Sequence, residues 1–241
     1  MNFENLKSRL FGDKEKSKQE TSPKEKYKSS PQEIVLESRD FEREGELLGG
    51  YIGGARFVKI RDDGGGVFKP HSRFESRRKS EFIARERAAY LISRFLGFDF
   101  VPPTIIKVVS DKEGSLQEFV EDARIGGEVE YDEIDPRERD KLRIFDYLIA
   151  NTDRHGGNYL FKDGKIFAID HGYTLSPENF TDYFNISVTE IPPDIAINLK
   201  RFVESEEQKS ILRDLLTELL GKSVANKFIK RVIAFTKSIN T

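Results

Sequence analysis

The sequence contains no cysteine, which excludes disulfide bonds and metal sites built on thiolates. It has no apolar run near the roughly 20 residues that a membrane-spanning helix needs, and its N-terminus lacks a signal peptide's apolar core. Neither sign of charge dominates, because 40 Lys and Arg residues oppose 42 Asp and Glu residues. A general nucleic-acid binder would be basic overall, so we expect no nucleic-acid partner. These absences predict a soluble cytoplasmic protein without a transmembrane segment.

The chain divides into three parts by composition. Residues 12–32 are almost wholly Lys, Glu, Ser, Gln and Pro, which cannot bury enough apolar surface to offset their ordering entropy. We therefore predict a disordered charged tail over residues 1–33. The remaining length is enough for two lobes, one strand-rich over 34–121 and one helical over 122–241, with a cleft between them.

The first lobe is predicted to be a small sheet with one helix. Two apolar runs, 51–60 and 67–68, flank a glycine-rich turn and predict a hairpin. A helix over 76–96 follows and ends at Gly97. The segments "VPPTIIKVVS" (101–110) and "SLQEFVE" (115–121) predict two further strands.

The second lobe carries clear helix signals. The segment "DPRE" (135–138) combines an N-cap residue, a proline at the first helical position and an early acid. Ser205, with Gln208 three residues later, predicts the start of a helix that Gly221 ends. Ser223 is predicted to begin the last helix.

The segment "NTDRHGGNYLFKDGKIFAIDHG", residues 151–172, concentrates small polar residues directly after the 136–150 helix. Its middle reads as two short strands joined by an Asp-Gly turn. The outer ends of such a hairpin lie close together, so Asp153, Asn158 and Asp170 should converge at one edge.

Two carboxylates and an amide at a loop edge suit phosphoryl transfer from a nucleotide. Magnesium takes such oxygen ligands, and an unpaired aspartate can receive the proton of the attacking hydroxyl. The kinase template places an Asn five residues after the catalytic Asp, followed by Asp-x-Gly on the next strand, and this sequence has both spacings. Lys69, at the end of a strand after the glycine cluster, would be the phosphate-binding cation. Either Glu86 or Glu81 on the following helix could hold it.

The segments "GGARFVK", "GVFKP", "ERAAYLISRFLGFDFVPPT", "LQEFVE", "IFDYLIANTDRHGGNYL" and "IFAIDHG" resemble the phosphatidylinositol 3- and 4-kinase superfamily. They are closest to its type II 4-kinase branch and to related microbial kinases, and the resemblance spans about residues 49–178. It implies an α+β, two-lobed protein-kinase-like fold, with a small β-rich N-lobe, a larger helical C-lobe and an ATP cleft between them.

The resemblance also assigns roles to individual residues. Asp153 would be the catalytic aspartate, and Asn158 and Asp170 would bind Mg²⁺, with Mn²⁺ as an alternative ion. Arg154 and His155 would shape the catalytic loop, a structural role being favoured for His155. The residues implied to bind ATP are Gly53, Gly54, Ala55, Lys69, Glu86 and the hinge residues Gln117, Glu118, Phe119 and Val120.

The phosphate acceptor stays open among three hypotheses. The segment 171–194, which corresponds to an activation loop, has no Lys or Arg, which disfavours an already phosphorylated inositol head group. The first hypothesis, slightly favoured, is an ATP-dependent kinase acting on protein Ser or Thr. Its targets could include its own tail, at Thr21, Ser22, Ser29 or Ser30. The second is a lipid kinase acting on phosphatidylinositol through peripheral membrane contact, and the third is a nucleotide-binding regulatory module with little turnover.

Overall fold

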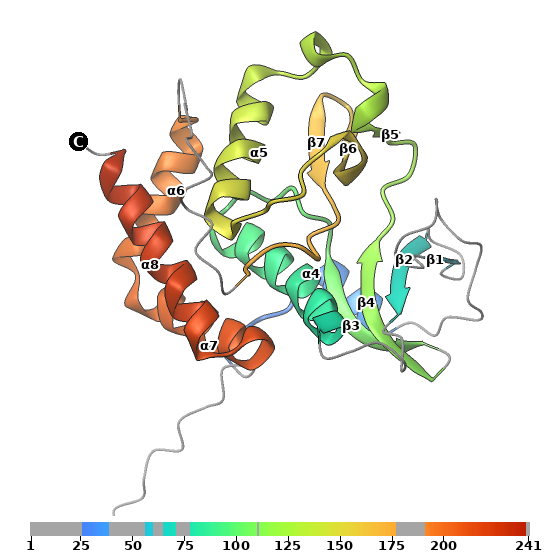
Figure 1. Cartoon of the computed structure of the whole chain (residues 1–241), viewed down its shortest axis with the longest axis horizontal. Helices are drawn as coiled ribbons and strands as arrows, with labels where there is room; N and C mark the ends of the chain where they lie inside the picture. Colours follow the sequence, from blue (N-terminus) through green and yellow to red (C-terminus); the bar gives the residue numbers. More distant parts are fainter. Residues whose placement is uncertain are drawn as a thin grey trace, which may run out of the picture.

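The computed structural model describes residues 26–38, 56–59, 65–70, 78–109, 111–176 and 191–239. Within them, a four-stranded antiparallel sheet has the strand order β1-β2-β4-β3 and lies on one side of the molecule (Figure 1). A second sheet, of order β5-β6-β7, lies beside helix α5 (Figure 1). The strands are β1 (Arg56–Lys59), β2 (Gly65–Pro70), β3 (Thr104–Val109), β4 (Lys112–Glu118), β5 (Arg124–Ile125), β6 (Tyr159–Lys162) and β7 (Lys165–Ala168).

Helices form the rest of the described fold, with α6, α7 and α8 gathered on the side away from the first sheet (Figure 1). Short 3₁₀ helices η1 (Gly126–Glu128), η2 (Tyr131–Glu133) and η3 (Gly156–Asn158) frame the second sheet. None of the helices in these described ranges combines the length and the apolar character needed to cross a membrane. The α-helices are α3 (Pro31–Ser38), α4 (Arg78–Phe95), α5 (Pro136–Ile149), α6 (Pro193–Glu204), α7 (Glu206–Leu220) and α8 (Lys222–Ser238).

The helix ends follow the local signals closely. The Asp135 carboxylate accepts a hydrogen bond from the Arg137 amide (2.7 Å), and the Ser205 hydroxyl accepts one from the Gln208 amide (3.2 Å). Gly221 ends α7 with φ +87°, a conformation that glycine adopts without strain. It also precedes α8, which begins at Lys222, one residue before the predicted start.

Two elements differ from the sequence-based expectation. β3 begins only at Thr104, because the two prolines before it cannot donate hydrogen bonds to a strand ladder. Helix α6 was not predicted, since its first residues lie in the segment assigned to an activation loop. It begins at Pro193, and a proline in the first turn of a helix loses no hydrogen bond that the helix would have made.

The hydrophobic residues form two cores, and α4 contributes to the larger one. The small core lies on the first sheet and joins Phe68, Ile105 and Leu116 to Leu36 of α3. In the larger core, the second half of α4 packs with α5 to α8, and α4 lies directly against α7. The predicted boundary between residues 121 and 122 therefore does not separate two independent cores.

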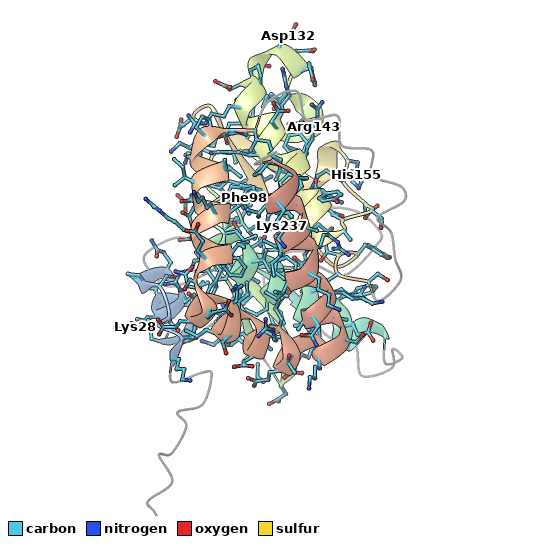
Figure 2. The ribbon with its side chains drawn as sticks, turned by 90° about the vertical axis from the view of Figure 1, so that its left-hand side faces the viewer. Lys28, Phe98, Asp132, Arg143, His155 and Lys237 are labelled. Carbon is cyan, nitrogen blue, oxygen red and sulfur yellow. The ribbon has the colours of Figure 1, made fainter. Side chains whose placement is uncertain are left out.

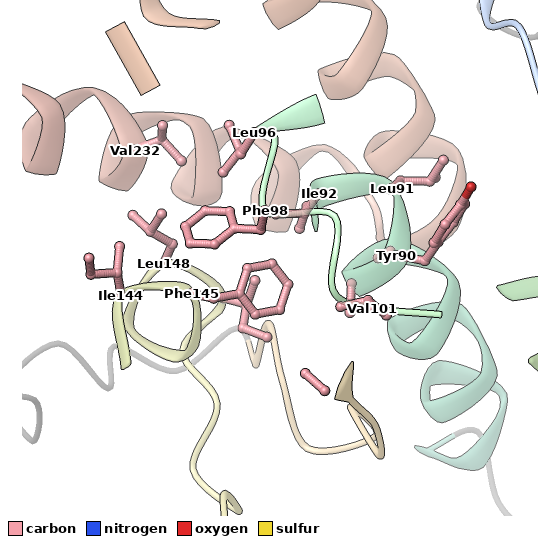
Figure 3. Packing of buried hydrophobic residues seen from close by; sticks show 14 of the residues in the cluster. Tyr90, Leu91, Ile92, Leu96, Phe98, Val101, Ile144, Phe145, Leu148 and Val232 are labelled. Carbon is pink, nitrogen blue, oxygen red and sulfur yellow. The ribbon is translucent and has the colours of Figure 1, made fainter. Parts of the chain in front are cut away.

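Aromatic rings join α5 to the segment that follows α4. The ring centroids of Phe98 and Phe145 are 5.2 Å apart (Figure 3), and those of Phe100 and Phe145 are 5.0 Å apart. Both pairs have the edge-to-face geometry that aromatic rings prefer. Phe145 is fully buried, so this cluster anchors the helix that precedes the 151–172 segment.

The predicted disordered tail needs a correction. Residues 26–33 belong to the described structure, in which α3 begins at Pro31 and Glu33 is completely buried. Composition could not predict this ordered segment, because Glu33 is buried through polar contacts with α4 and not through apolar surface. In Figure 2, Lys28 of this segment lies at the opposite end of the molecule from Asp132. Residues 1–25 lie outside the described residues.

We expect Phe145→Ala to lower the free energy of unfolding by about 3–5 kcal/mol, because it removes a buried ring from a three-ring cluster. The matched control is Ile197→Ala on α6, where the side chain is 51% exposed and the expected cost is below about 0.5 kcal/mol. Urea denaturation would measure both variants. Equal destabilisation by the two substitutions would contradict this description of the core.

Candidate active site

Lys69 on β2 binds two carboxylates from different elements. Its ammonium nitrogen lies 2.5 Å from Glu86 Oε1 of α4 and 3.2 Å from Asp170 Oδ1, just after β7. Glu81, the other predicted partner, instead pairs with Arg85 one helical turn away, at 2.9 Å. The structure thus places Glu86, not Glu81, beside Lys69.

Opposite charges stabilise the contacts of Lys69 with Glu86 and Asp170. Burial alone would raise the pKa of the Glu86 carboxyl, but the adjacent Lys69 ammonium outweighs it and holds the pKa far below its usual value. Burial would likewise lower the pKa of Lys69, yet Glu86 and Asp170 hold it above its usual value. Lys69 and Glu86 are therefore both charged, and 26% of the Lys69 side chain is accessible to solvent.

Helix α4 also holds the backbone directly after Asp170. The second oxygen of Glu86 accepts a hydrogen bond from the His171 amide (3.0 Å), and Arg85 donates to the Gly172 carbonyl (3.1 Å). Asp170 has φ +58°, a left-handed conformation that Asp tolerates better than most residues. Two neighbouring residues of α4 thus fix the position of the Asp170 carboxylate.

Arg154 lies inside the loop that it was predicted to shape. Its guanidinium binds the Asp146 carboxylate of α5 at 2.9 Å, and it donates to the carbonyls of Asn158 and Ile169. Its Nη2, one of the nitrogens bound to Asp146, also lies 3.3 Å from His171 Nε2. Arg154 therefore connects α5, the candidate catalytic loop and the end of β7.

His171 is a buried neutral ring between two charged networks. Burial lowers its pKa, and the positive charge of Arg154 acts in the same direction. Because Arg154 can only donate, His171 Nε2 must accept, which places the ring hydrogen on Nδ1. Nδ1 faces Glu86 Oε2 at 3.6 Å, too long for a hydrogen bond.

Asp153 and Asn158 are joined through the backbone of the loop. Asn158 is buried and its side-chain nitrogen donates to the Asp153 carbonyl (2.7 Å), while the Asp153 amide donates to Asn151 Oδ1 (3.0 Å). The side-chain nitrogen of Asn158 is thereby occupied. No group among the described residues donates to its side-chain oxygen Oδ1, which can therefore bind a cation. No group in the described ranges donates to the Asp153 carboxylate, which is half-buried.

His155 is an exposed residue of the predicted catalytic loop and lies near the edge of the molecule (Figure 2). Its Nδ1 accepts a hydrogen bond from the Gly157 amide (3.0 Å) and so caps η3. Gly156 comes next in the sequence. A Cβ atom at this position would lie 2.7 Å from Gly127 Cα, so glycine permits the close approach of the loop to η1.

The predicted hinge is only partly available to a nucleotide. The Gln117 side chain is buried and donates to Thr104 Oγ1 (2.9 Å), and the Phe119 amide donates to the Gly65 carbonyl (2.9 Å). The Glu118 amide donates to the Pro103 carbonyl (2.8 Å). Within the part of the chain that the structure describes, Val120 therefore offers the first hinge amide without a partner. Gly53, Gly54 and Ala55 lie outside the described residues.

Sequence reasoning missed four residues that organise the site. These are Arg85 and His171, which hold the segment after Asp170, and Asp146 and Asn151, which hold Arg154 and Asp153. A signal for one of them existed. Asp146 is a charged residue within the largely apolar run "RIFDYLIA". Burial of its carboxylate without a partner would be very costly in free energy, so this position predicts a buried partner.

The oxygen atoms at this site suit a magnesium ion bound together with a nucleotide. Among the described residues, no group of three His, Asp or Glu side chains is arranged to hold a metal. Magnesium usually binds one or two protein carboxylates and completes its shell with substrate phosphates and water. Asp170, with 49% of its side chain exposed, and Asn158 Oδ1 fit that requirement.

We expect Arg154→Met to lower the free energy of unfolding by about 3–5 kcal/mol, because it leaves the buried Asp146 carboxylate unpaired. The matched control is Arg137→Met on α5, which breaks an ion pair with Asp194 whose two side chains are 55% and 40% exposed, at a cost below about 1 kcal/mol. Adding Asp146→Asn to Arg154→Met should recover part of the loss. Denaturation curves that rank Arg137→Met as the more harmful change would contradict the inferred role of Arg154.

The model for the family "Phosphatidylinositol 3- and 4-kinase" matches residues 81–227, more than half of the 241-residue chain. The chain is 37% identical over 125 residues to phosphatidylinositol 4-kinase gamma 4 of Oryza sativa subsp. japonica, covering 44% of this chain and 22% of that protein. It is 36% identical over 129 residues to phosphatidylinositol 4-kinase gamma 4 of Arabidopsis thaliana, covering 42% of this chain and 23% of that protein. The chain thus spans less than a quarter of the length of these two relatives.

Among solved structures, the fold is similar to that of the Helicobacter pylori proinflammatory kinase CtkA. The TM-score is 0.50 at 14% identity, over 84% of this chain and 97% of that chain. This likeness concerns the fold alone, and it confirms the predicted α+β, protein-kinase-like architecture. Since the family model covers α4, the catalytic loop and the Asp-His-Gly segment, the chain belongs to the phosphatidylinositol 3- and 4-kinase family.

Proposed function

We propose that this chain is an ATP-dependent kinase that transfers the γ-phosphate to a hydroxyl group, with protein Ser or Thr as the acceptor. One observation carries the proposal: Lys69 joins Glu86 of α4 to Asp170, the arrangement that kinases need around the nucleotide phosphates. The catalytic loop then supplies the carboxylate of Asp153, to which no described group donates, and the oriented side-chain amide of Asn158.

The two ends of the site have separate tasks. The Lys69 ammonium binds the α- and β-phosphates, and its ion pair with Glu86 keeps it beside Asp170. Asn158 Oδ1 and the Asp170 carboxylate would hold Mg²⁺, which when bound would neutralise the phosphate charge. The Val120 amide of the predicted hinge would hydrogen-bond the adenine ring.

Asp153 acts on the acceptor. The acceptor oxygen bonds to the γ-phosphorus while the bond from that phosphorus to the β–γ bridging oxygen breaks and ADP leaves. The hydroxyl proton passes to the Asp153 carboxylate, which no described side chain neutralises. Hydrogen bonds to Asn151 and Asn158 hold the backbone of Asp153, so most of the rate enhancement comes from positioning.

Two classes of phosphate acceptor, and one function without phosphate transfer, are weighed against each other. A protein hydroxyl is favoured because residues 171–194 carry four acidic residues and no Lys or Arg, which provides no cation for an inositol phosphate. Phosphatidylinositol itself is the second candidate, because the relatives at 37% and 36% identity are named phosphatidylinositol 4-kinases. The hypothesis of a low-turnover regulatory module has the least support. A module that had lost kinase activity would be expected to lack at least one of the residues that the chemistry needs, and all of them are present: Lys69, Asp153, Asn158 and Asp170.

We expect Asp153→Asn to reduce phosphate transfer by about 100- to 10,000-fold, the range for removal of a general base. Binding of Mg-ATP should be nearly unchanged, because Asp153 contacts the acceptor and not the nucleotide. The matched control is Asp163→Asn in the exposed turn between β6 and β7, where φ is +50° and Asn is tolerated. Transfer from γ-labelled ATP and a thermal shift with Mg-ATP measure the two properties, and a fully active Asp153→Asn variant would contradict the assignment.

The acceptor can be identified by adding γ-labelled ATP and magnesium to wild-type protein in three conditions. These are the protein alone, the protein with a mixed protein substrate, and the protein with phosphatidylinositol vesicles. Label in protein supports the first acceptor class, and label extracted with lipid only when vesicles are present supports the second. Nucleotide binding without transfer in any condition would favour the regulatory reading.

A further inference from the structure

Among the described residues, the most extensively hydrogen-bonded buried carboxylate outside the candidate site is that of Glu33 on α3. It is completely buried, although it directly follows the polar segment 12–32. It accepts hydrogen bonds or ion pairs from Tyr27 Oη (2.8 Å), the Ser30 amide (2.8 Å), Arg87 Nη1 (2.7 Å), Tyr90 Oη (2.9 Å) and Arg94 Nη1 (2.9 Å).

The charges in this cluster are matched. Burial alone would raise the pKa of the Glu33 carboxyl, but the Ser30 amide and the Arg87 guanidinium outweigh it and hold the pKa below its usual value. Burial raises the pKa of Tyr90 to about 12, so its hydroxyl stays a donor near neutral pH. An ionised carboxylate buried so fully is stable only because every partner is in place.

The partners on α4 lie beside the active-site glutamate. Arg87, Tyr90 and Arg94 are spaced i, i+3 and i+7, so they line one face of the helix. Glu86, which pairs with Lys69, immediately precedes Arg87. The Glu33 carboxylate therefore holds α4 at the level of the residue that faces Lys69.

The other side of α3 is attached to the first sheet. Leu36 belongs to the small core, and Lys107 of β3 donates to the carbonyls of Leu36 (3.0 Å) and Glu37 (2.9 Å) at the end of α3. Residues 26–38, which we call the N-terminal strap, thus connect the sheet that carries Lys69 to the helix that carries Glu86.

We propose that the N-terminal strap is a positioning element for phosphate transfer, in which Glu33 holds α4 so that Glu86 meets Lys69. The inference rests on the proposed kinase function, because a kinase needs this lysine–glutamate pair in place to align the nucleotide phosphates. Glu33 does not touch the reacting atoms and acts through α4. Residues 26–33, which composition alone assigns to a disordered tail, therefore belong to an element that positions α4.

The test uses the full-length chain with Glu33→Gln, which keeps the size of the side chain and removes its charge. We expect kcat to fall about tenfold, within the range for substitutions that act through a packed network. Glu37→Gln is the matched control, because it makes the same chemical change on the exposed face of the same helix. It should leave kcat at the wild-type value.

A double variant separates positioning from mere stability. If Glu33 acts through Glu86, then Glu33→Gln should lower kcat little further once Glu86→Gln is present. All rates are measured well below the melting temperature and per molecule of folded protein. Equal losses of kcat in the wild-type and Glu86→Gln backgrounds would overturn the proposal, and so would wild-type activity of a folded Glu33→Gln protein.

A second readout does not depend on kinase activity. The rate at which an amine-acylating reagent modifies Lys69, mapped by mass spectrometry, reports whether its ammonium is held by Glu86. We expect this rate to rise several-fold in Glu33→Gln and to stay unchanged in Glu37→Gln, relative to the exposed Lys165 as internal reference. If Glu33→Gln does not fold, Tyr90→Phe removes one donor to the same carboxylate and should shift both readouts in the same direction.

The two proposals can fail separately. Suppose that the wild-type protein transfers no phosphate, but that Lys69 is acylated several-fold faster in the Glu33→Gln variant, as expected. This result would contradict the kinase function and would still support the link between the strap and Lys69. An active wild type with no change in either readout on Glu33→Gln and Tyr90→Phe would contradict the positioning role and leave the kinase function supported.

Discussion

The carboxylate of Glu86 is the group on which the candidate site depends, because its two oxygens bind two different parts of the fold. One oxygen pairs with Lys69 of the first sheet, and the other accepts the backbone amide that follows Asp170. A buried carboxylate without these partners would be very costly, so β2, α4 and the segment after β7 are stable only in one relative arrangement. That arrangement brings Lys69, the candidate phosphate-binding cation, within 3.2 Å of Asp170, the candidate metal ligand.

A second buried ion pair supports the candidate catalytic loop. Arg154 binds the Asp146 carboxylate of α5, the Asn158 carbonyl of the loop and the Ile169 carbonyl after β7, and His171 lies between Arg154 and Glu86. Charged and polar groups thus form a continuous buried series from the first sheet to α5. Such a series specifies geometry more than it adds stability, because each member is costly when its neighbour moves.

Helix α4 connects this polar series to the hydrophobic cores. Its Ala88, Leu91 and Ile92 are buried in the large helical core, and its Arg87, Tyr90 and Arg94 bind the N-terminal strap. The helix is therefore fixed on the C-terminal helices and on the strap at the same time. A movement of the first sheet relative to the helical core would have to break contacts on α4, which explains why one boundary at residue 121 does not divide the molecule.

Local signals in the sequence were sufficient for the helix ends at Asp135, Ser205 and Gly221, for the hairpin of β6 and β7, and for the order of the kinase-like segments, because these depend on residues close together in the chain. The sequence alone could not choose between Glu81 and Glu86, since both lie on α4 and only the packing of α4 against β2 decides which faces Lys69. It also could not reveal the burial of Glu33, because the five groups that compensate its charge come from residues 27–94 and meet only in the folded state. Composition and periodicity report the free energy of apolar burial, whereas a buried polar group is stabilised by partners whose identity only the tertiary structure decides.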